Sequence, residues 1–576
     1  MPILQITDFN IVVSVLGGWI SLFGLVSYLL KENFYLSEAL ISLLAGITFS
    51  PHALDWVKPL NYAGSQANVD LITLYFTRLV LGVQLVLAGV QLPSRYLQKE
   101  WKPLALLLGP IMTAMWLATS LLVWAFVPHI PFLHALALGA CVTPTDPVLS
   151  NVIVKGKFAD HNVPKDLQKI IIAESGANDG LGYPFLFLAL YLIKYVGDGA
   201  GSTPGGGGLA IGLWFGETWG YTIILSTIYG AAVGWVAKEL LHYCEEKKFV
   251  DRESFLVFAL SLALFITGTC GLIGSDDILA NFIAGNVFTW DDWFRLETLD
   301  EASLQPTIDM LLNVTIFMWY GVVCPWHTFV ANSVIPIGRL IPLAILILLL
   351  RRPPFVLAIH KKIHQIEGIR HAIFMGFFGP IGCSAIFYLF VTNQFIATLN
   401  PGGGDEPRSD VANLAETVSV IVWFMVVVSV VVHGLSIPLG KLGFYLPRTI
   451  SRTVSTPGEP ERPPFQIGNI MDRFSRPDKG SNTPNDSRST SARPVFRIGG
   501  SIIPPGPQES SGQQSRMQST RTSMQGDLSP NDDDEPTFPV EGGVAAAALP
   551  RPQAAAVPPP RKIRFPDEEQ AMEQPS

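Results

Sequence analysis

The sequence predicts an all-α polytopic membrane protein with about thirteen transmembrane helices, and three observations support this prediction. Hydrophobic residues make up 49% of the 576 residues and charged residues only 15%, against about 25% charged in a typical soluble domain. Apolar runs recur along the first 445 positions, and about 20 apolar residues suffice to cross a bilayer core. One of these runs carries two prolines within five positions and another a Gly-Pro-Ile-Gly sequence near its middle, which predicts helices interrupted within the membrane.

Thirteen apolar runs can be delimited, and together they predict one transmembrane domain over residues 10–445. They lie at about residues 10–30, 36–54, 71–93, 103–127, 132–154, 169–195, 212–237, 254–273, 277–290, 307–326, 333–350, 371–395 and 413–440. The fourth run contains no charge at all, whereas the ninth is the shortest.

The loops rich in Lys and Arg predict the orientation of the chain. They follow the third, fifth, seventh and eleventh runs, at residues 94–102, 155–169, 238–248 and 351–370. Short cytoplasmic loops carry the excess of basic residues in membrane proteins. Because all four loops follow odd-numbered runs, we expect the N-terminus outside and the C-terminus in the cytoplasm. The first residues lack a basic n-region, so no cleaved signal peptide is expected.

Net charge and cysteine content exclude several classes of protein. The formal charge of −8 argues against a broadly basic, nucleic-acid-binding surface. The five cysteines are odd in number, lie mostly in apolar runs and form no CxxC pair. Neither a disulfide framework nor a cysteine metal centre is therefore expected, and the sequence indicates no cofactor.

The composition changes abruptly after the last apolar run. Residues 446–576 are rich in Pro, Ser, Gly, Gln and acidic side chains, with too little apolar surface to offset the chain entropy lost on folding. We expect a disordered cytoplasmic regulatory tail. Serines close to arginines, such as Ser455, Ser491 and Ser523, make a kinase or another regulator a candidate partner, although such neighbours also arise by chance here. The basic and apolar stretch 441–455 suits contact with anionic membrane lipid.

The fifth run carries Thr143-Pro144-Thr145-Asp146-Pro147 at its centre. Each proline lacks an N–H and crowds the carbonyl four residues back, so the helix is expected to break here. Broken backbone at membrane depth is tolerated where it is buried in protein or lines a polar cavity. The break would leave oxygen atoms beside Asp146, and hard cations bind oxygen ligands. Alternatively, Asp146 only caps the end of a kinked helix.

The sixth run contains Glu174, Asn178 and Asp179 within an apolar stretch. Glu174 and Asn178 are four residues apart and share a helix face. At 1.5 Å per residue, Asp146 and Asp179 both fall in the middle third of the bilayer, where ionisable groups mark ion or proton pathways. Exclusion from water disfavours a bare carboxylate, so such a group holds either a proton or a cation. That competition is sufficient for cation/proton exchange.

The twelfth run is also interrupted near its middle, at Gly379-Pro380-Ile381-Gly382. It lies seven runs after the fifth, an odd number, so the two runs cross the membrane in opposite directions. Paired interrupted helices of inverted topology indicate a secondary transporter with a site at the bilayer midplane. The sequence therefore predicts inverted-topology repeats with two crossing interrupted helices.

Further ionisable residues lie at the ends of the runs. Arg351 and Arg352 close the eleventh run; we expect Arg351 to be a cytoplasmic anchor. Arg352 is either a second anchor or the partner of Glu174, because a buried carboxylate without a partner is costly. Asp276 and Asp277 open the ninth run, either as N-cap and first-turn acids or as the lining of a cation vestibule. Asp309 and Asn313 in the tenth run, and His433 in the last, are expected to be structural.

Four stretches of the sequence carry a family resemblance. They read ACVTPTDPVLSNVIVKGKFA, AESGANDGLGYPFLFL, SDDILANFIAGNVFTWDDWF and FFGPIGCSAIFYL. Over about residues 10–445 the chain resembles the cation/proton antiporter superfamily, and within it the fungal plasma-membrane alkali-metal cation (Na⁺,K⁺)/H⁺ antiporters. The resemblance implies a homodimer in which a core domain moves against a dimerisation domain. Many non-fungal relatives carry an arginine in the fourth stretch, where this chain has Ile381.

The resemblance also implies residue roles by motif. Asp179 would be the ion- and proton-binding carboxylate. Thr145 and Asp146 of the unwound helix would complete the metal ligands, and Asn178 would support Asp179.

Two further pairs take their roles from the same resemblance. Glu174 and Arg352 would form the core ion pair. Asp276 and Asp277 match an acidic pair that takes part in transport.

The expected function is export of Na⁺ or Li⁺, with K⁺ as a further candidate, in exchange for protons by alternating access. Such exchange serves salt tolerance and pH and cation homeostasis; no enzyme activity is expected. The resemblance implies the plasma membrane, and an endosomal membrane is the alternative. One rival is a cation channel, although repeated pore loops are not found. Another is an intramembrane aspartyl protease, which also needs two carboxylates, but its GxGD and YD signatures are absent from the apolar runs.

Overall fold

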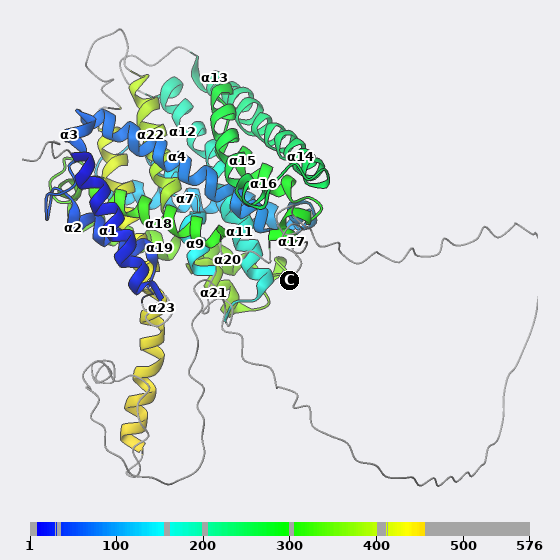
Figure 1. The fold of residues 1–576 in the computed structure, drawn as a ribbon. Helices are drawn as coiled ribbons and strands as arrows, with labels where there is room; N and C mark the ends of the chain where they lie inside the picture. The colour runs from blue at the N-terminus through cyan, green and yellow to red at the C-terminus, as the bar shows by residue number, and fades with distance from the viewer. Residues whose placement is uncertain are drawn as a thin grey trace, which may run out of the picture. The chain divides into compact units, whose positions relative to one another are not determined.

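The computed structural model describes residues 8–28, 30, 36–154, 162–197, 205–298, 304–399, 411 and 413–455. For residues 28, 151–154, 298, 304 and 439–455 only the backbone is described. Within these ranges the regular elements are helices and none is a strand, which confirms the predicted all-α fold (Figure 1).

Each of the thirteen expected spans coincides with a helix or with helices joined end to end. The unbroken spans are α1 (Asp8–Tyr28), α2 (Glu38–Phe49), α4 (Gln66–Gln91), α15 (Arg252–Ile273), α16 (Asp277–Phe288), α18 (Leu304–Val323), α19 (Ile337–Leu350) and α23 (Leu414–Ser455). Two spans contain a π-helical segment, as α6 (Trp101–Leu106), η2 (Leu107–Ile111) and α7 (Met112–Phe126), and as α13 (Gly206–Leu213), η3 (Trp214–Ile224) and α14 (Leu225–Glu246). Three are interrupted, as α8 (Phe132–Cys141) with α9 (Pro147–Val154), α11 (Lys165–Gly180) with α12 (Tyr183–Val196), and α21 (Ile369–Phe377) with α22 (Cys383–Ala397).

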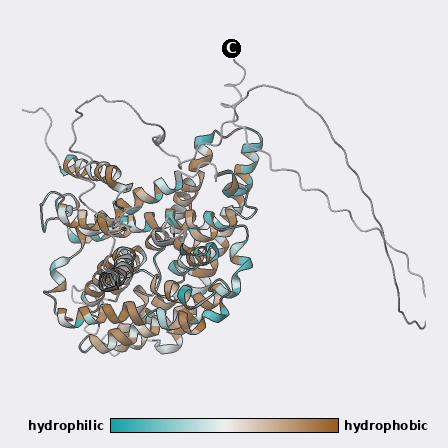
Figure 2. Cartoon of the chain, turned by 90° about the horizontal axis from the view of Figure 1, so that it is seen from below, coloured by the Kyte–Doolittle hydropathy of each residue, from teal (hydrophilic) through white to brown (hydrophobic). Residues whose placement is uncertain are grey.

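The remaining described elements are short. They are α3 (Pro59–Ala63), α5 (Tyr96–Lys99), α17 (Trp293–Thr298), η5 (Trp326–Phe329), α20 (Pro353–Ile359) and η6 (His360–Lys362). Eight of the described helical segments are long and apolar enough to cross a membrane, and four more apolar helices are shorter. Large apolar side chains such as Leu25, Trp235 and Leu272 are exposed, and apolar residues prevail along the helices (Figure 2). Such surfaces suit contact with lipid.

Local sequence explains where several helices begin, widen and end. Pro110 lies inside η2, where a missing N–H and a crowded carbonyl favour the wider π-helical turn. The N-cap of α15 is Asp251, whose side chain accepts a hydrogen bond of 2.8 Å from the Ser254 amide. The hydrogen bonds from Ser254 lower the pKa of Asp251. The same helix ends at Ile273 and is capped by Gly274, whose φ of 78° is the left-handed conformation that glycine adopts without strain.

We distinguish two groups of helices, which contact each other through pairs such as α22 with α4 and α11 with α16. The scaffold group is α2, α4, α14, α15, α16 and α18, and the crossing group is α7, α8, α9, α11, α12, α19, α22 and α23. Within the scaffold group, α16 packs between α4 and α14 (Figure 1). A Cβ atom at Gly285 of α16 would collide with the Val86 carbonyl of α4, and one at Gly230 of α14 would collide with the Ala280 carbonyl of α16. These helices therefore touch backbone to backbone.

The two groups meet, among other places, where the glycines of α11 lie against α16. A Cβ atom at Gly176 of α11 would collide with the Phe282 ring of α16, and one at Gly180 would lie 2.5 Å from Leu279 Cβ. The glycine face of α11 thus lies against the side chains of α16. This contact brings the end of α11 close to the start of α16.

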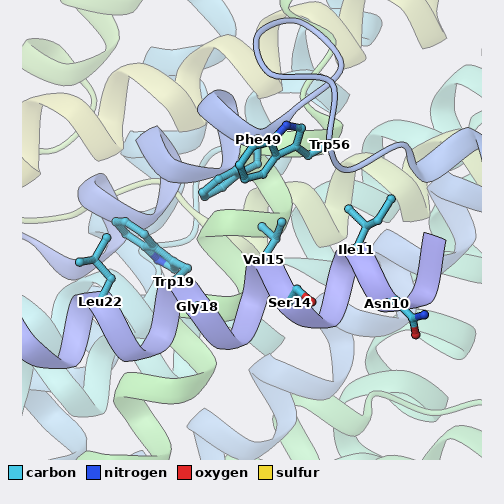
Figure 3. A pocket seen from close by; sticks show the side chains of 9 residues that line it. All are labelled: Asn10, Ile11, Ser14, Val15, Gly18, Trp19, Leu22, Phe49 and Trp56. Carbon is cyan, nitrogen blue, oxygen red and sulfur yellow. The ribbon is translucent and has the colours of Figure 1, made fainter. Parts of the chain in front are cut away.

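The first described helix, α1, packs little against the rest of the chain, and the last, α23, continues beyond the predicted span 413–440. Only 11% of the apolar window of α1 is buried, and α1 and the end of α2 border a groove of about 430 Å³. In Figure 3, Ile11, Val15 and Trp19 of α1 lie opposite Phe49 and Trp56 across this groove. At the other end, α23 continues to Ser455, and residues 456–576, which hold most of the predicted tail, lie outside the described residues.

Candidate functional site

Two interrupted helices cross at their breaks. The first break lies between α8, which ends at Cys141, and α9, which begins at Pro147; the second lies between α21, which ends at Phe377, and α22, which begins at Cys383. The Asp146 amide donates a hydrogen bond of 3.0 Å to the Pro380 carbonyl, from one break to the other. The pair of crossing interrupted helices predicted from the sequence is therefore present.

Two glycines allow the second break to approach the first. A Cβ atom at Gly382 would collide with Asp146 Oδ2. One at Gly379 would lie 2.5 Å from Arg352 Cδ and 3.0 Å from Thr145 Cγ2. The GPIG sequence thus provides both the helix break and the space for the crossing.

The Asp146 carboxylate caps two helices at once. Its Oδ1 accepts hydrogen bonds of 2.7 and 3.3 Å from the amides of Val148 and Leu149 in α9. Its Oδ2 accepts a hydrogen bond from the Cys383 amide at the start of α22. The positive ends of both helix dipoles therefore face this carboxylate. The helix cap that was one of the two alternatives for Asp146 is therefore present.

Asn178 attaches the first break to α11. Its Oδ1 accepts a hydrogen bond of 3.1 Å from the Thr145 amide, and its Nδ2 donates one of 2.7 Å to Thr145 Oγ1. The side chain thus satisfies backbone that the prolines leave without helical partners. Because Asn178 precedes Asp179 directly, the same contact positions the next carboxylate.

Asp179 is the one carboxylate at the crossing that the described residues leave unsatisfied. It is 0% exposed, and neither of its carboxylate oxygens has a hydrogen-bond partner. Ser384 in the first turn of α22 lies beside this carboxylate, but neither side chain has a partner with the distance and angle of a hydrogen bond in the described part of the chain. The Tyr388 hydroxyl donates to the Asp179 carbonyl and fixes the backbone. A bare carboxylate in this position would be costly, so the site requires a proton or a cation.

Glu174, one helical turn before Asn178, forms a buried bidentate ion pair with Arg352. Arg352 Nη1 and Nη2 lie 2.7 Å from Glu174 Oε1 and Oε2, and the side chains are 2% and 3% exposed. Arg352 Nε also donates a hydrogen bond of 3.0 Å to the Met375 carbonyl of α21. The pair ties α11 to the second interrupted helix just before its break.

The prediction that Arg351 is a cytoplasmic anchor is wrong. Its guanidinium is buried and donates to the carbonyls of Val142 in the first break and Gly379 in the second, with longer bonds to Thr143 and Pro144. These carbonyls follow the ends of α8 and α21, where helix carbonyls lack partners and carry partial negative charge. Arg351 thus holds the crossing together. A basic residue directly after an apolar run predicts a cytoplasmic anchor, but the sequence does not show which atoms of other helices lie near its side chain.

His433 and Ser429 of α23 hold the second break from its other side. The Ile381 amide donates a hydrogen bond of 2.8 Å to Ser429 Oγ, and His433 Nε2 lies 3.0 Å from the Phe377 carbonyl. His433 Nδ1 lies 3.1 Å from Ser429 Oγ. The expectation that His433 is structural agrees with these contacts.

Asp276 and Asp277 lie beside the crossing rather than at an exposed surface. Asp276 caps α16 through hydrogen bonds of 3.0 and 3.1 Å from the amides of Ile278 and Leu279. Arg78 of α4, which the sequence analysis missed, donates from Nε to Asp277 Oδ2 at 2.8 Å. An arginine inside an apolar run was the available signal, because such residues mark functional sites.

Crossing helix breaks around a buried, unsatisfied carboxylate define a class of membrane protein, the secondary transporters. Residues 19–439 match the model of the family described as "Sodium/hydrogen exchanger, transmembrane", and the chain belongs to this family. The chain is 36% identical over 451 residues to "Na(+)/H(+) antiporter 2" of Zygosaccharomyces rouxii, covering 77% of this chain and 54% of that protein.

Two further comparisons extend this result. A "Na(+)/H(+) antiporter" of Saccharomyces cerevisiae is 36% identical over 79% of this chain and 46% of its own length, so the chain spans about half the length of these two relatives. One of Schizosaccharomyces pombe is 29% identical over 78% of this chain and 95% of its length. The solved structure of the sodium proton antiporter MjNhaP1 from Methanocaldococcus jannaschii shares the fold, with a TM-score of 0.54 at 17% identity over 75% of this chain and 98% of that one.

Proposed function

We propose that this protein exports Na⁺ or Li⁺ from the cytoplasm in exchange for protons, with K⁺ as a third candidate substrate. The observation that carries the proposal is Asp179, a fully buried carboxylate whose oxygens have no hydrogen-bond partner among the described residues. Three fungal relatives that bear the name Na⁺/H⁺ antiporter support the same activity.

The chemistry follows from competition at one carboxylate. A proton on Asp179 neutralises it, or a cation binds it together with hydroxyl oxygens such as those of Ser384 and Thr145. Asp146 lies close enough to interact with Asp179, so its negative charge makes the bare state still less favourable. Each arriving species therefore displaces the other.

Alternating access requires the occupied site to face each side in turn. Asp179 lies in the crossing group, and the glycine face of α11 lies against α16 of the scaffold group. Movement of the crossing group along α16 is the proposed step that changes the side to which Asp179 opens. Because a bare carboxylate is costly, the movement takes place with a proton or a cation bound, which couples the two fluxes.

The test is reconstitution of the full chain in liposomes that contain a pH-sensitive dye. Addition of Na⁺ or Li⁺ is expected to drive proton movement that persists when an ionophore clamps the voltage, and K⁺ is tested in the same way. Asp179→Asn should abolish the signal, and the matched control Asp166→Asn, at the exposed start of the same helix, should retain it. Cation flux without proton movement would identify a channel instead.

The proposal includes a homodimer. The apolar helix α1 is mostly exposed, and it offers a membrane-facing surface to a second copy. Cross-linking of the full chain in native membranes is expected to trap a dimer, and cysteine pairs introduced along α1 would locate the contact. A purely monomeric chain at every concentration in the membrane would contradict this part of the proposal.

The proposal also places the protein in the plasma membrane, with its N-terminus outside and its tail in the cytoplasm. The alternation of basic loops supports this orientation. A fluorescent tag at the C-terminus should mark the cell surface and resist external protease, whereas an N-terminal epitope should be accessible from outside. Fluorescence confined to internal compartments would favour the endosomal alternative.

A further inference from the structure

A half-buried arginine lies beside the site without a role in the exchange described above. Arg78 is in the middle of α4, and its side chain is 29% exposed. Its Nε donates a hydrogen bond of 2.8 Å to Asp277 Oδ2, and the Asp277 side chain is only 3% exposed. A Cβ atom at Gly271 of α15 would lie 2.5 Å from Arg78 Nη2. Gly271 thus makes room for the guanidinium between α4, α15 and α16.

Asp276, the neighbour of Asp277, has a hydrogen-bond partner among the described residues for only one of its two carboxylate oxygens. Asp276 is 0% exposed, and its Oδ1 accepts the amides of Ile278 and Leu279. Its Oδ2 has no hydrogen-bond partner among the described residues. Two adjacent acids therefore differ in environment, because one has an arginine and the other keeps a free oxygen.

The free oxygen of Asp276 points at the backbone next to Asp179. A Cβ atom placed on Gly180 would lie 2.9 Å from Asp276 Oδ2. Gly180 is the residue after Asp179, so this oxygen reaches from the scaffold group to the chain that carries the exchange carboxylate. The absence of a side chain at Gly180 permits the approach.

The geometry points to Arg78 as a resident counter-cation that occupies Asp277 permanently and leaves Asp276 as the single available carboxylate beside Asp179. Arg78 is then a positioning residue that sets the apparent affinity for the transported cation. The inference rests on the proposed function and deepens it, since it concerns the cation affinity of the same site. The guanidinium makes the net charge of the cluster one unit more positive than it would be without Arg78.

The sign of each substitution follows from this charge count. Arg78→Gln adds one negative charge near the transported cation and should lower its apparent KM. Asp277→Asn leaves the guanidinium without its carboxylate, adds one positive charge and should raise the apparent KM. Charges on adjacent helices, whose axes lie about 8–10 Å apart, shift binding by about tenfold in each direction at an effective dielectric constant of about 25.

The test measures cation-dependent proton movement in liposomes over a range of Na⁺ and Li⁺ concentrations. Arg78→Gln should lower KM about tenfold and Asp277→Asn should raise it about tenfold. The double variant Arg78→Gln/Asp277→Asn should return KM to within about threefold of the wild type, since the charge count is restored. Arg78→Lys keeps the charge and should stay close to the wild type.

A matched control comes from α17. Arg295 Nε donates a hydrogen bond of the same length, 2.8 Å, to Asp292, and Arg295→Gln should leave KM unchanged. A purely structural Arg78 would lower protein yield or maximal rate in both single variants without opposite shifts in KM. Shifts of KM in the same direction, or a double variant that folds but does not recover, would overturn the inference. If the wild type itself shows no cation-dependent proton movement, that result overturns the proposed function instead.

Discussion

The buried ion pair between Glu174 and Arg352 gives the sharpest prediction about stability. Glu174→Gln keeps the size of the side chain but removes its charge. Both N–O distances in the pair are 2.7 Å, and both side chains are almost fully buried. Removing one partner leaves an uncompensated buried charge, which costs about 3–5 kcal/mol. Replacing both charges should cost less, because no charge is then left alone.

Unfolding of the detergent-purified chain in denaturant measures this difference. We expect Glu174→Gln to lose about 3–5 kcal/mol, and the double variant Glu174→Gln/Arg352→Gln to be more stable than either single variant. The control Asp166→Asn breaks an exposed pair with Lys169 and should change stability by no more than about 1 kcal/mol. The reasoning is refuted if the double variant is as unstable as the sum of the two single variants.

Three further predictions concern the crossing. Arg351→Met should lose about 2–4 kcal/mol in the same unfolding assay, because several carbonyls of both breaks lose a charged donor; wild-type stability would contradict its assigned role. Gly382→Ala places a Cβ atom against the Asp146 carboxylate and should cost about 1–3 kcal/mol with a loss of exchange, whereas Gly268→Ala, which has nothing within 4 Å, should be neutral in both assays. Ser384→Ala should raise the KM for Na⁺ several-fold at unchanged stability, and an unchanged KM would remove this hydroxyl from the cation site.

Much of the crossing could be predicted from the sequence because backbone chemistry determines it. Proline disfavours a continuous helix, and the pair Pro144 and Pro147 and the Gly379-Pro380-Ile381-Gly382 sequence predicted the two breaks. A single proline does not suffice, because Pro342 lies inside the unbroken α19. Charged residues within apolar runs are costly, which singled out Glu174 and Asp179. The helical positions follow from the same apolar runs.

The roles that depend on three-dimensional approach could not be predicted in the same way. Arg351 follows an apolar run, and only the turn of the chain after α19 places its guanidinium among carbonyls at the crossing. The Asp146 carboxylate accepts a hydrogen bond from the amide of Cys383, a residue that is far away in sequence. Arg78 acquires its meaning from Asp277 on another helix. Each of these contacts joins separate helices, and sequence spacing carries no information about them.

The central claim is that Asp179 holds a proton or a cation but not both. The direct measurement is proton release from the detergent-solubilised chain in weakly buffered solution when Na⁺ or Li⁺ is added, recorded with a pH indicator. The wild type is expected to release protons in a saturable manner as the cation binds, and Asp179→Asn is expected to release none while remaining folded. Equal proton release from wild type and variant would contradict the claim.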